Sequence, residues 1–213
     1  MKRRVFSASL LATGALALPQ WARAQRIPKE GTEYRTLRRP AVSAVPPGKI
    51  EVVEFFWYSC PHCNNFEPQL EAWAKAAPPD VVLRRIPVGF REDFVPQQRL
   101  FFALEGLGKV GELHAKVFHA IHAERQPVNR EDGIVAWAQK QGIDKAKFLE
   151  VYNSDFVNTK VKQALVLQEA YAVEGVPALG IAGRYYTDGG MAGTMVRALQ
   201  VADFLIAQVR DKR

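Results

Sequence analysis

The two cysteines of this chain stand where a predicted buried strand meets a predicted helix, and this junction constrains the fold more than any other feature. The preceding stretch, Ile50–Tyr58, is β-rich and mostly apolar, which predicts a central strand buried on both faces. A helix is predicted from Cys60 to Ala76, because apolar residues recur at helical spacing. These residues are Phe66, Leu70, Trp73 and Ala77. The Cys60-x-x-Cys63 pair therefore falls in the first turn of a helix that follows a buried strand.

The neighbouring segments extend this junction into a strand–helix–strand unit. Val81–Val88 predicts a second strand, and a crossover through a helix joins strands that pair in parallel. Pro68 lies inside the connecting helix, where a proline removes one hydrogen bond and predicts a kink. Tyr34–Leu37 predicts a short edge strand ahead of the unit.

The second half of the chain has a different pattern. Residues 92–165 show apolar positions at helical spacing, interrupted by glycines and Pro127, which predicts a block of helices, with Asp144 as a candidate helix cap. The later predicted elements are a helix over Thr159–Val173, a hairpin of Ala178–Ile181 and Tyr185–Thr187, and a last helix over Thr194–Val209. We therefore expect an α/β protein with an all-helical insertion, divided into residues 25–91, 92–165 and 166–213.

The first 24 residues predict an export signal. Lys2-Arg3-Arg4 is followed by an apolar run from Val5 to Leu18 that is too short and too alanine-rich for a good membrane span. Ala22-Arg23-Ala24 fits the small-x-small rule, so cleavage is expected after Ala24. Arg3-Arg4 leaves both the general and the twin-arginine export routes open. The formal charge of +7 includes four charges in this segment, and no basic block interleaved with aromatic residues predicts nucleic-acid binding.

Two functions of the cysteine pair must be weighed, a passive staple and a reactive dithiol. A disulfide between Cys60 and Cys63 closes a ring of only four residues, so its effect on chain entropy is small. The free N–H groups and the dipole at a helix start favour an anion, which lowers the pKa of Cys60 below that of a free thiol. A stabilised thiolate favours the reduced dithiol and makes the disulfide an oxidant.

Residues inside the motif modify this chemistry. His62 can stabilise the Cys60 thiolate by charge or by hydrogen bonding, and Pro61 restricts the turn. A zinc site is the less favoured alternative, because Cys60 and Cys63 supply only two of the four ligands that a structural zinc requires. The remaining candidate ligands are His114, His119 and His122. We expect no metal.

The stretch Glu51–Glu67, with its Cys-Pro-His-Cys tetrapeptide, resembles the DsbA family of the thioredoxin superfamily. Pro68 coincides with a kink proline common in that superfamily, and the helical insertion has the family's expected place. The resemblance covers essentially residues 32–210. It implies a thioredoxin-like fold with an all-helical insertion domain.

The resemblance also implies roles for residues outside the motif. Val176-Pro177 matches a cis-proline pair that faces the dithiol and binds an extended client peptide by strand addition. Glu54 matches a buried acid beneath the dithiol that assists proton transfer from Cys63. Whether Arg85 is the basic neighbour of that acid stays open.

The function implied is that of a periplasmic oxidoreductase that introduces disulfides into unfolded exported proteins. The resemblance implies recycling by a quinone-linked membrane oxidase of the DsbB kind, and the exchange chemistry requires no dissociable cofactor. We expect a monomer, because the sequence shows no obvious oligomerisation element. A reductase or isomerase of the same fold and a non-catalytic peptide-binding module remain as alternatives.

Overall fold

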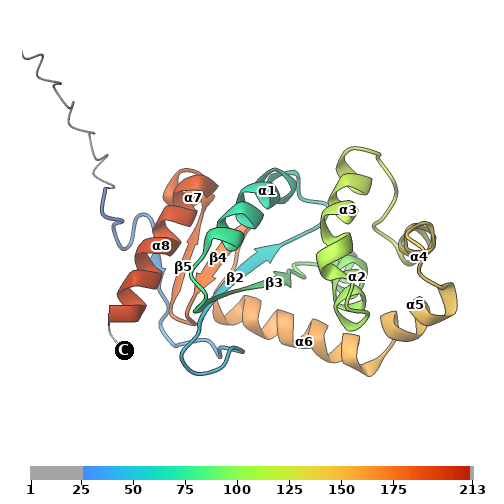
Figure 1. Cartoon of the computed structure of the whole chain (residues 1–213), viewed down its shortest axis with the longest axis horizontal. Helices are drawn as coiled ribbons and strands as arrows, with labels where there is room; N and C mark the ends of the chain where they lie inside the picture. Colours follow the sequence, from blue (N-terminus) through green and yellow to red (C-terminus); the bar gives the residue numbers. More distant parts are fainter. Residues whose placement is uncertain (1–25, 212–213) are drawn as a thin grey trace, which may run out of the picture.

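The computed structural model describes residues 26–211, so the predicted export signal and its cleavage site lie outside the described residues. Figure 1 shows a sheet with helices packed on it at one end and a block of helices at the other. The strands are β1 (Arg35–Thr36), β2 (Ile50–Phe56), β3 (Val81–Pro87), β4 (Ala178–Ile181) and β5 (Tyr185–Asp188). The helices are α1 (Pro61–Ala76), α2 (Val95–Gly106), α3 (Val110–His122), α4 (Glu131–Lys140), α5 (Lys145–Tyr152), α6 (Asp155–Ala170), α7 (Gly189–Ala192) and α8 (Met195–Asp211), and a 3-10 turn covers Glu92–Phe94.

The strands form one mixed sheet in the order β1-β5-β4-β2-β3. β2 pairs with β3 in parallel through the α1 crossover, as the strand–helix–strand pattern predicts, and with β4 in antiparallel orientation. Each residue of β2 is buried, which fits its apolar sequence and its place between two partners. The predicted edge strand is present as β1, shortened to Arg35–Thr36 and paired with β5.

Helices cover both faces of the sheet. On one face, Val52 of β2 belongs to a core that includes Phe66 and Leu70 of α1 and Leu205 of α8. On the other face, Phe55 belongs to a second core, and its ring lies against Tyr171 with the centroids 5.2 Å apart. This alternation along β2 places Glu54 on the face that α1 covers.

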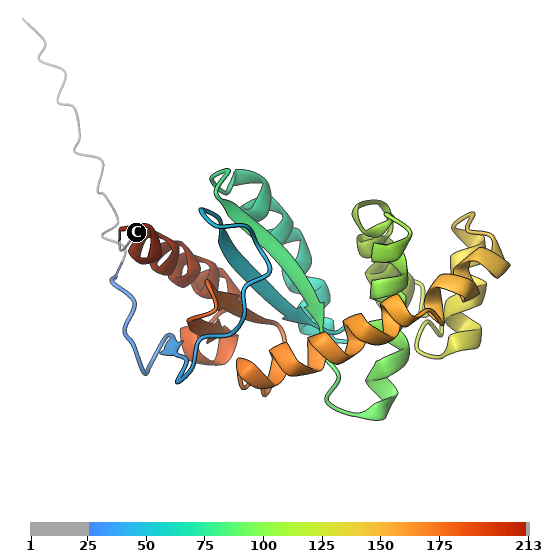
Figure 2. The same cartoon turned by 90° about the horizontal axis from the view of Figure 1, so that it is seen from below.

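The helices α2 to α6 form the predicted helical block between β3 and β4. The core of the block is continuous with the core on the Phe55 face of the sheet, and in it Trp137 of α4 and Phe148 of α5 are almost fully buried. α6 runs from the block back along the sheet, as Figures 1 and 2 show from two directions. This arrangement confirms the predicted fold class, an α/β protein with an all-helical insertion.

Local capping explains where several helices begin. The side chain of Asp144 accepts a hydrogen bond from the backbone N–H of Lys147, which confirms the predicted cap of α5. α6 begins at Asp155, earlier than the predicted Thr159, because Ser154 accepts from the backbone N–H of Val157 and caps the helix there. Pro68 lies within α1, as predicted.

The short helix α7 has no counterpart in the sequence prediction. It follows β5 directly, and the Asp188 side chain caps it by accepting from the backbone N–H of Met191. Its Gly189-Gly190 start gives little helical propensity, so local pattern does not reveal it. Among residues 26–211, no helix is both long and apolar enough to cross a membrane.

Candidate functional site

The cysteine pair lies at the junction of β2 and α1, as the sequence predicts. After β2 the chain makes a turn in which the backbone N–H of Cys60 donates to the Trp57 carbonyl at 3.0 Å. Cys60 is the N-cap residue of α1, in extended conformation, and Pro61 is its first helical residue. Proline suits this position because the first helical N–H has no partner inside the helix.

The environment of Cys60 favours its thiolate. Cys60 is 8% exposed, and its Sγ lies 3.5 Å from the Val176 carbonyl oxygen. A hydrogen bond from the Cys63 thiol, aided by the backbone N–H groups of Cys63 and His62 and by the charge of His62, lowers the pKa of Cys60 to about 6 against the effect of burial. The predicted setting of a thiolate at a helix start is therefore present.

Cys63 has the opposite environment. It is fully buried, one turn further into α1, and burial together with its proximity to Cys60 raises its pKa far above that of a free thiol. Both cysteines are free thiols in this structure. The neutral Cys60 thiol donates to the Val176 carbonyl oxygen, whereas its thiolate form accepts the hydrogen bond of the Cys63 thiol. At neutral pH the two sulfurs are thus a thiolate and a thiol.

Val176–Pro177 lies opposite the dithiol, and its peptide bond is cis, as the family resemblance implies. The two residues and the exposed His62 line a cavity of about 560 Å³ beside Cys60. The opposite wall is formed by the segment that includes Asp188, the start of α7, and Met195. These lining residues were not predicted from the sequence, where their local signal is the capping pattern of Asp188 before two glycines.

Glu54 lies buried beneath the dithiol on the α1 face of the sheet, with no exposed surface. Burial raises its pKa well above that of an ordinary carboxyl, and the neighbouring Glu67 adds to the effect. Glu54 also interacts electrostatically with Cys63 and contributes to the raised pKa of that thiol. Glu54 is therefore close enough to Cys63 to act on its thiol electrostatically.

Arg85 of β3 pairs with acids of both β2 and α1. Its Nε lies 3.2 Å from Glu54 Oε2, and its Nη2 lies 2.7 Å from Glu67 Oε1 and 2.5 Å from Glu71 Oε1. The pairing follows from register, since Glu54 and Arg85 are direct neighbours across the parallel β2–β3 ladder. Arg85 is therefore the basic neighbour of Glu54, which the sequence had left open.

The candidate metal ligands do not gather around the cysteines. Within residues 26–211, the group of side chains spaced to hold an ion consists of Glu54, Glu67 and His114, whose ligand atoms lie within 4.8 Å of one another. The Arg85 guanidinium already contacts both of these carboxylates, so a cation would have to displace a fixed positive charge. His119 lies elsewhere, exposed and paired with Glu124.

Comparison with known proteins places this geometry in a family. Residues 51–200 match the model of the DSBA-like thioredoxin domain. The chain belongs to the DsbA family. It is 37% identical over 212 residues to the thiol:disulfide interchange protein DsbA of Burkholderia cepacia, and the match covers 99% of each chain. It is 41% identical to DsbA of Bordetella parapertussis, over 99% of this chain and 100% of the relative.

Solved structures of DsbA proteins have the same fold. The crystal structure of Pseudomonas aeruginosa DsbA matches with a TM-score of 0.81 and 38% identity, over 86% of this chain and 95% of that one. That of Xylella fastidiosa DsbA also matches with a TM-score of 0.81, at 28% identity over 87% and 99% of the two chains. The chain is therefore a thiol–disulfide oxidoreductase with a thioredoxin fold, which acts by thiol–disulfide exchange.

Proposed function

We propose that this DsbA-family protein works as a dithiol oxidase that places disulfides into exported proteins through Cys60 and Cys63. The observation that supports this direction best is the lowered pKa of Cys60, about 6. A thiolate that is stable in the reduced protein makes reduction of the disulfide favourable, and it also makes Cys60 a good leaving group. Both effects drive electrons from the client to the protein.

The reaction begins with the Cys60–Cys63 disulfide. A client thiolate attacks Cys60 Sγ, the Cys60–Cys63 bond breaks, and a mixed disulfide between the client and Cys60 forms while Cys63 leaves as a thiolate and takes up a proton. A second client thiolate then attacks the client sulfur of this mixed disulfide. The client disulfide forms, Cys60 leaves as a thiolate, and two electrons have passed from the client to the protein.

Glu54 is the proposed proton donor and acceptor for Cys63. Its raised pKa keeps the carboxyl protonated near neutral pH, so it can protonate the leaving Cys63 thiolate. In the reverse sense, when the dithiol is oxidised again, the carboxylate form takes the proton from Cys63. Pro61 and His62 are the proposed residues that shape the motif and stabilise the Cys60 thiolate.

Val176 and Pro177 are proposed to bind the client chain. The Val176 carbonyl faces Cys60 at 3.5 Å, so a client strand paired with this backbone would bring its cysteine to the sulfur. The cavity beside Val176, with Met195 on its far wall, would accept a side chain next to the client cysteine. Backbone recognition of this kind tolerates many sequences, which suits an enzyme with unfolded protein clients.

The proposal extends to the cellular setting. Residues 1–24 act as a signal that is removed after Ala24, and the mature protein works in the periplasm as a monomer without a dissociable cofactor. A quinone-linked membrane oxidase of the DsbB kind returns the dithiol to the disulfide. Residues 92–165 act as a helical unit inserted into a thioredoxin-like unit formed by 25–91 and 166–213.

The direct test is oxidative refolding of a reduced, unfolded client by the oxidised protein, with Cys60→Ser and Cys63→Ser as variants. We expect both variants to lose client oxidation, because neither can form the Cys60–Cys63 disulfide that accepts the two electrons. When Cys63→Ser is instead given a client that already carries a disulfide, its Cys60 thiolate should attack that bond and remain joined to the client as a mixed disulfide, because Cys63 is absent to release it. Unchanged oxidation by Cys60→Ser would contradict the enzyme mechanism and favour a peptide-binding role. Transfer of electrons to, rather than from, a client disulfide would favour a reductase or isomerase.

A further inference from the structure

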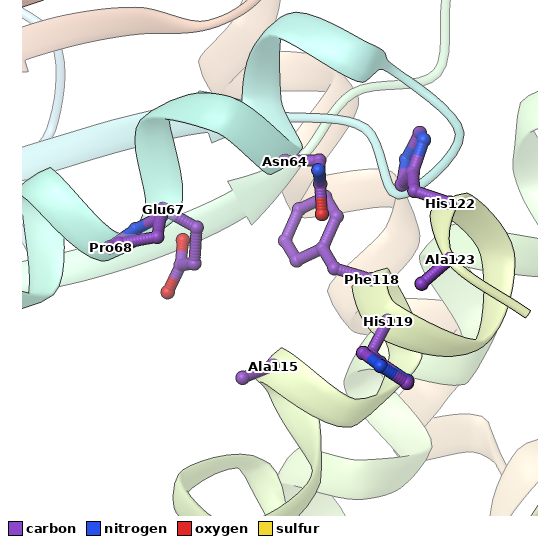
Figure 3. Close-up of a pocket in the computed structure, with 8 residues that line it drawn as sticks. All are labelled: Asn64, Glu67, Pro68, Ala115, Phe118, His119, His122 and Ala123. Carbon is purple, nitrogen blue, oxygen red and sulfur yellow. The ribbon is translucent and has the colours of Figure 1, made fainter.

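One face of α3 is directed at the turn that precedes Cys60. His114, Phe118 and His122 are spaced four residues apart and form a single row, here called the α3 stripe. Tyr58, two residues before Cys60, lies against all three of these side chains. Figure 3 shows Phe118 and His122 pointing from α3 toward the start of α1 and the chain that enters it.

The α3 stripe holds Tyr58 at three separate points. The Tyr58 hydroxyl lies 2.8 Å from His114 Nδ1, and its ring packs edge-on against Phe118 with centroids 5.1 Å apart. His122 Nε2 lies 2.8 Å from the Tyr58 carbonyl oxygen. Because a carbonyl oxygen can only accept, His122 Nε2 is the donor of this bond.

The hydrogen-bonding role of His114 follows from its neighbours. Burial lowers the pKa of His114, so the ring is neutral, with one donor and one acceptor nitrogen. Nε2 faces Glu67 Oε2 at 3.4 Å, and Glu71 of α1 and Arg85 of β3 also act on the ring electrostatically. A proton on Nε2 leaves Nδ1 as the acceptor of the Tyr58 hydroxyl, which keeps its proton because burial raises its pKa.

The helical block contacts other residues of the turn besides Tyr58. The Trp57 ring stacks on Phe94 with centroids 4.0 Å apart. The Gln97 side chain of α2 donates to Ser59 Oγ at 2.8 Å. Since the Cys60 N–H closes this turn on the Trp57 carbonyl, the conformation of the turn decides how the Cys60 sulfur meets the first N–H groups of α1.

We propose that the α3 stripe is a positioning device for the dithiol, in which His114 and His122 fix both ends of Tyr58 and thereby hold the Cys60 sulfur at the backbone N–H groups of the first turn of α1. The histidines do not touch the reacting sulfurs in this arrangement, so they are positioning residues. The inference rests on the proposed role of Cys60 as the stabilised thiolate. It gives the helical insertion a direct part in setting the redox chemistry of the thioredoxin-like unit.

The test compares three substitutions on α3. His122→Leu removes the donor to Tyr58, His122→Gln keeps an N–H at similar reach, and His119→Leu is the control, because His119 lies on α3 outside the stripe and is exposed. The readouts are the Cys60 pKa from thiolate absorbance and the redox equilibrium constant with glutathione. We expect His122→Leu to raise the pKa and make the disulfide about three- to tenfold less oxidising, the effect of one lost hydrogen bond. His122→Gln and His119→Leu should match the unmodified protein.

Tyr58→Phe provides an independent arm. It keeps the ring and the carbonyl and removes only the hydroxyl that donates to His114 Nδ1. It should therefore raise the Cys60 pKa, as His122→Leu does. This variant keeps the proposal testable even if His122→Leu does not fold. A fall in thermal stability with an unchanged Cys60 pKa in both Tyr58→Phe and His122→Leu would overturn the proposal and leave the stripe a packing feature. The function is tested separately, because Cys60→Ser must still abolish client oxidation.

Discussion

Cys60 and Cys63 carry the same functional group three residues apart, yet their surroundings move their pKa values in opposite directions. Cys60 meets N–H groups at the start of α1, whereas Cys63 is buried in the core beneath them. Titratable groups whose environments separate their pKa values in this way take different roles in a reaction. This separation is the residue-scale basis of the exchange chemistry.

His62 is expected to contribute to the thiolate state of Cys60 through its side-chain charge. His62→Ala removes this charge and leaves the backbone N–H bonds, so the pKa of Cys60 should rise by up to about one unit. Thiolate absorbance measured against pH in the reduced protein checks this. Asn65→Ala, an exposed change on the same helix, is the control. An equal Cys60 pKa in His62→Ala and Asn65→Ala would contradict a role for the imidazole.

Glu54 is expected to act on Cys63 and hardly on Cys60. Glu54→Gln keeps the shape of the neutral carboxyl and cannot transfer a proton, so resolution of a mixed disulfide by Cys63 should slow by about a hundredfold, the lower end of general acid–base effects. Stopped-flow oxidation of the reduced protein by glutathione disulfide measures this step. Glu71→Gln is the matched control, since Glu71 also binds Arg85 but is partly exposed. Equal rates in the two variants would exclude Glu54 from the proton transfer.

At the scale of elements, the β2–α1 unit was predictable because its signals are local. A continuous apolar run, a following helical period and a proline at the helix start each act within a few residues. The contact between Glu54 and Arg85 could not be fixed from sequence, because it depends on the register of β2 against β3. A slip of one residue would place Arg84 opposite Glu54.

Two helical glycines of the block, Gly133 and Gly111, are expected to respond oppositely to replacement by alanine. A Cβ added at Gly133 of α4 would lie 2.0 Å from the Pro127 carbonyl oxygen. A Cβ added at Gly111 of α3 would meet no atom within 4 Å. Gly133→Ala should therefore reduce the free energy of unfolding by about 1–3 kcal/mol, and Gly111→Ala should raise it by up to about 1 kcal/mol. Chemical denaturation measures both. Equal effects of the two changes would contradict the close approach of Gly133 to the Pro127 carbonyl oxygen.

At the scale of the whole molecule, the sheet and the helical block meet at the turn before Cys60. The contacts of Tyr58 with His114 and His122 join residues that are 56 and 64 positions apart. No periodicity or spacing in the sequence reports such contacts. The histidines could therefore be weighed from sequence as zinc ligands or as solvated or interhelical residues, but they could not be paired with Tyr58. The α7 wall of the site was missed for a related reason, because its residues matter through their place beside Val176 and not through a local pattern.

The stability of the whole reduced protein should depend on pH through Cys60. Its pKa is about 6 when folded and close to 9 when unfolded, so the stabilisation is fully present above pH 9 and is lost as pH falls through 6. The oxidised protein has neither the Cys60 nor the Cys63 thiol, and the remaining titrating groups are common to both forms. Cys63 keeps its proton in the folded and the unfolded chain below about pH 8, because burial raises its folded pKa above that of a free thiol. The thermal midpoint of the reduced form relative to the oxidised form should therefore rise between pH 5 and pH 8. A constant difference over this range would contradict a stabilised thiolate.

The redox equilibrium between the Cys60–Cys63 pair and glutathione tests most directly whether the protein is built to accept electrons. The account predicts that the disulfide form oxidises glutathione readily, so the protein is found as the dithiol even in mixtures rich in glutathione disulfide. A pair that stays oxidised until glutathione is in large excess would contradict the account, because the Cys60 thiolate would then give the reduced state no advantage.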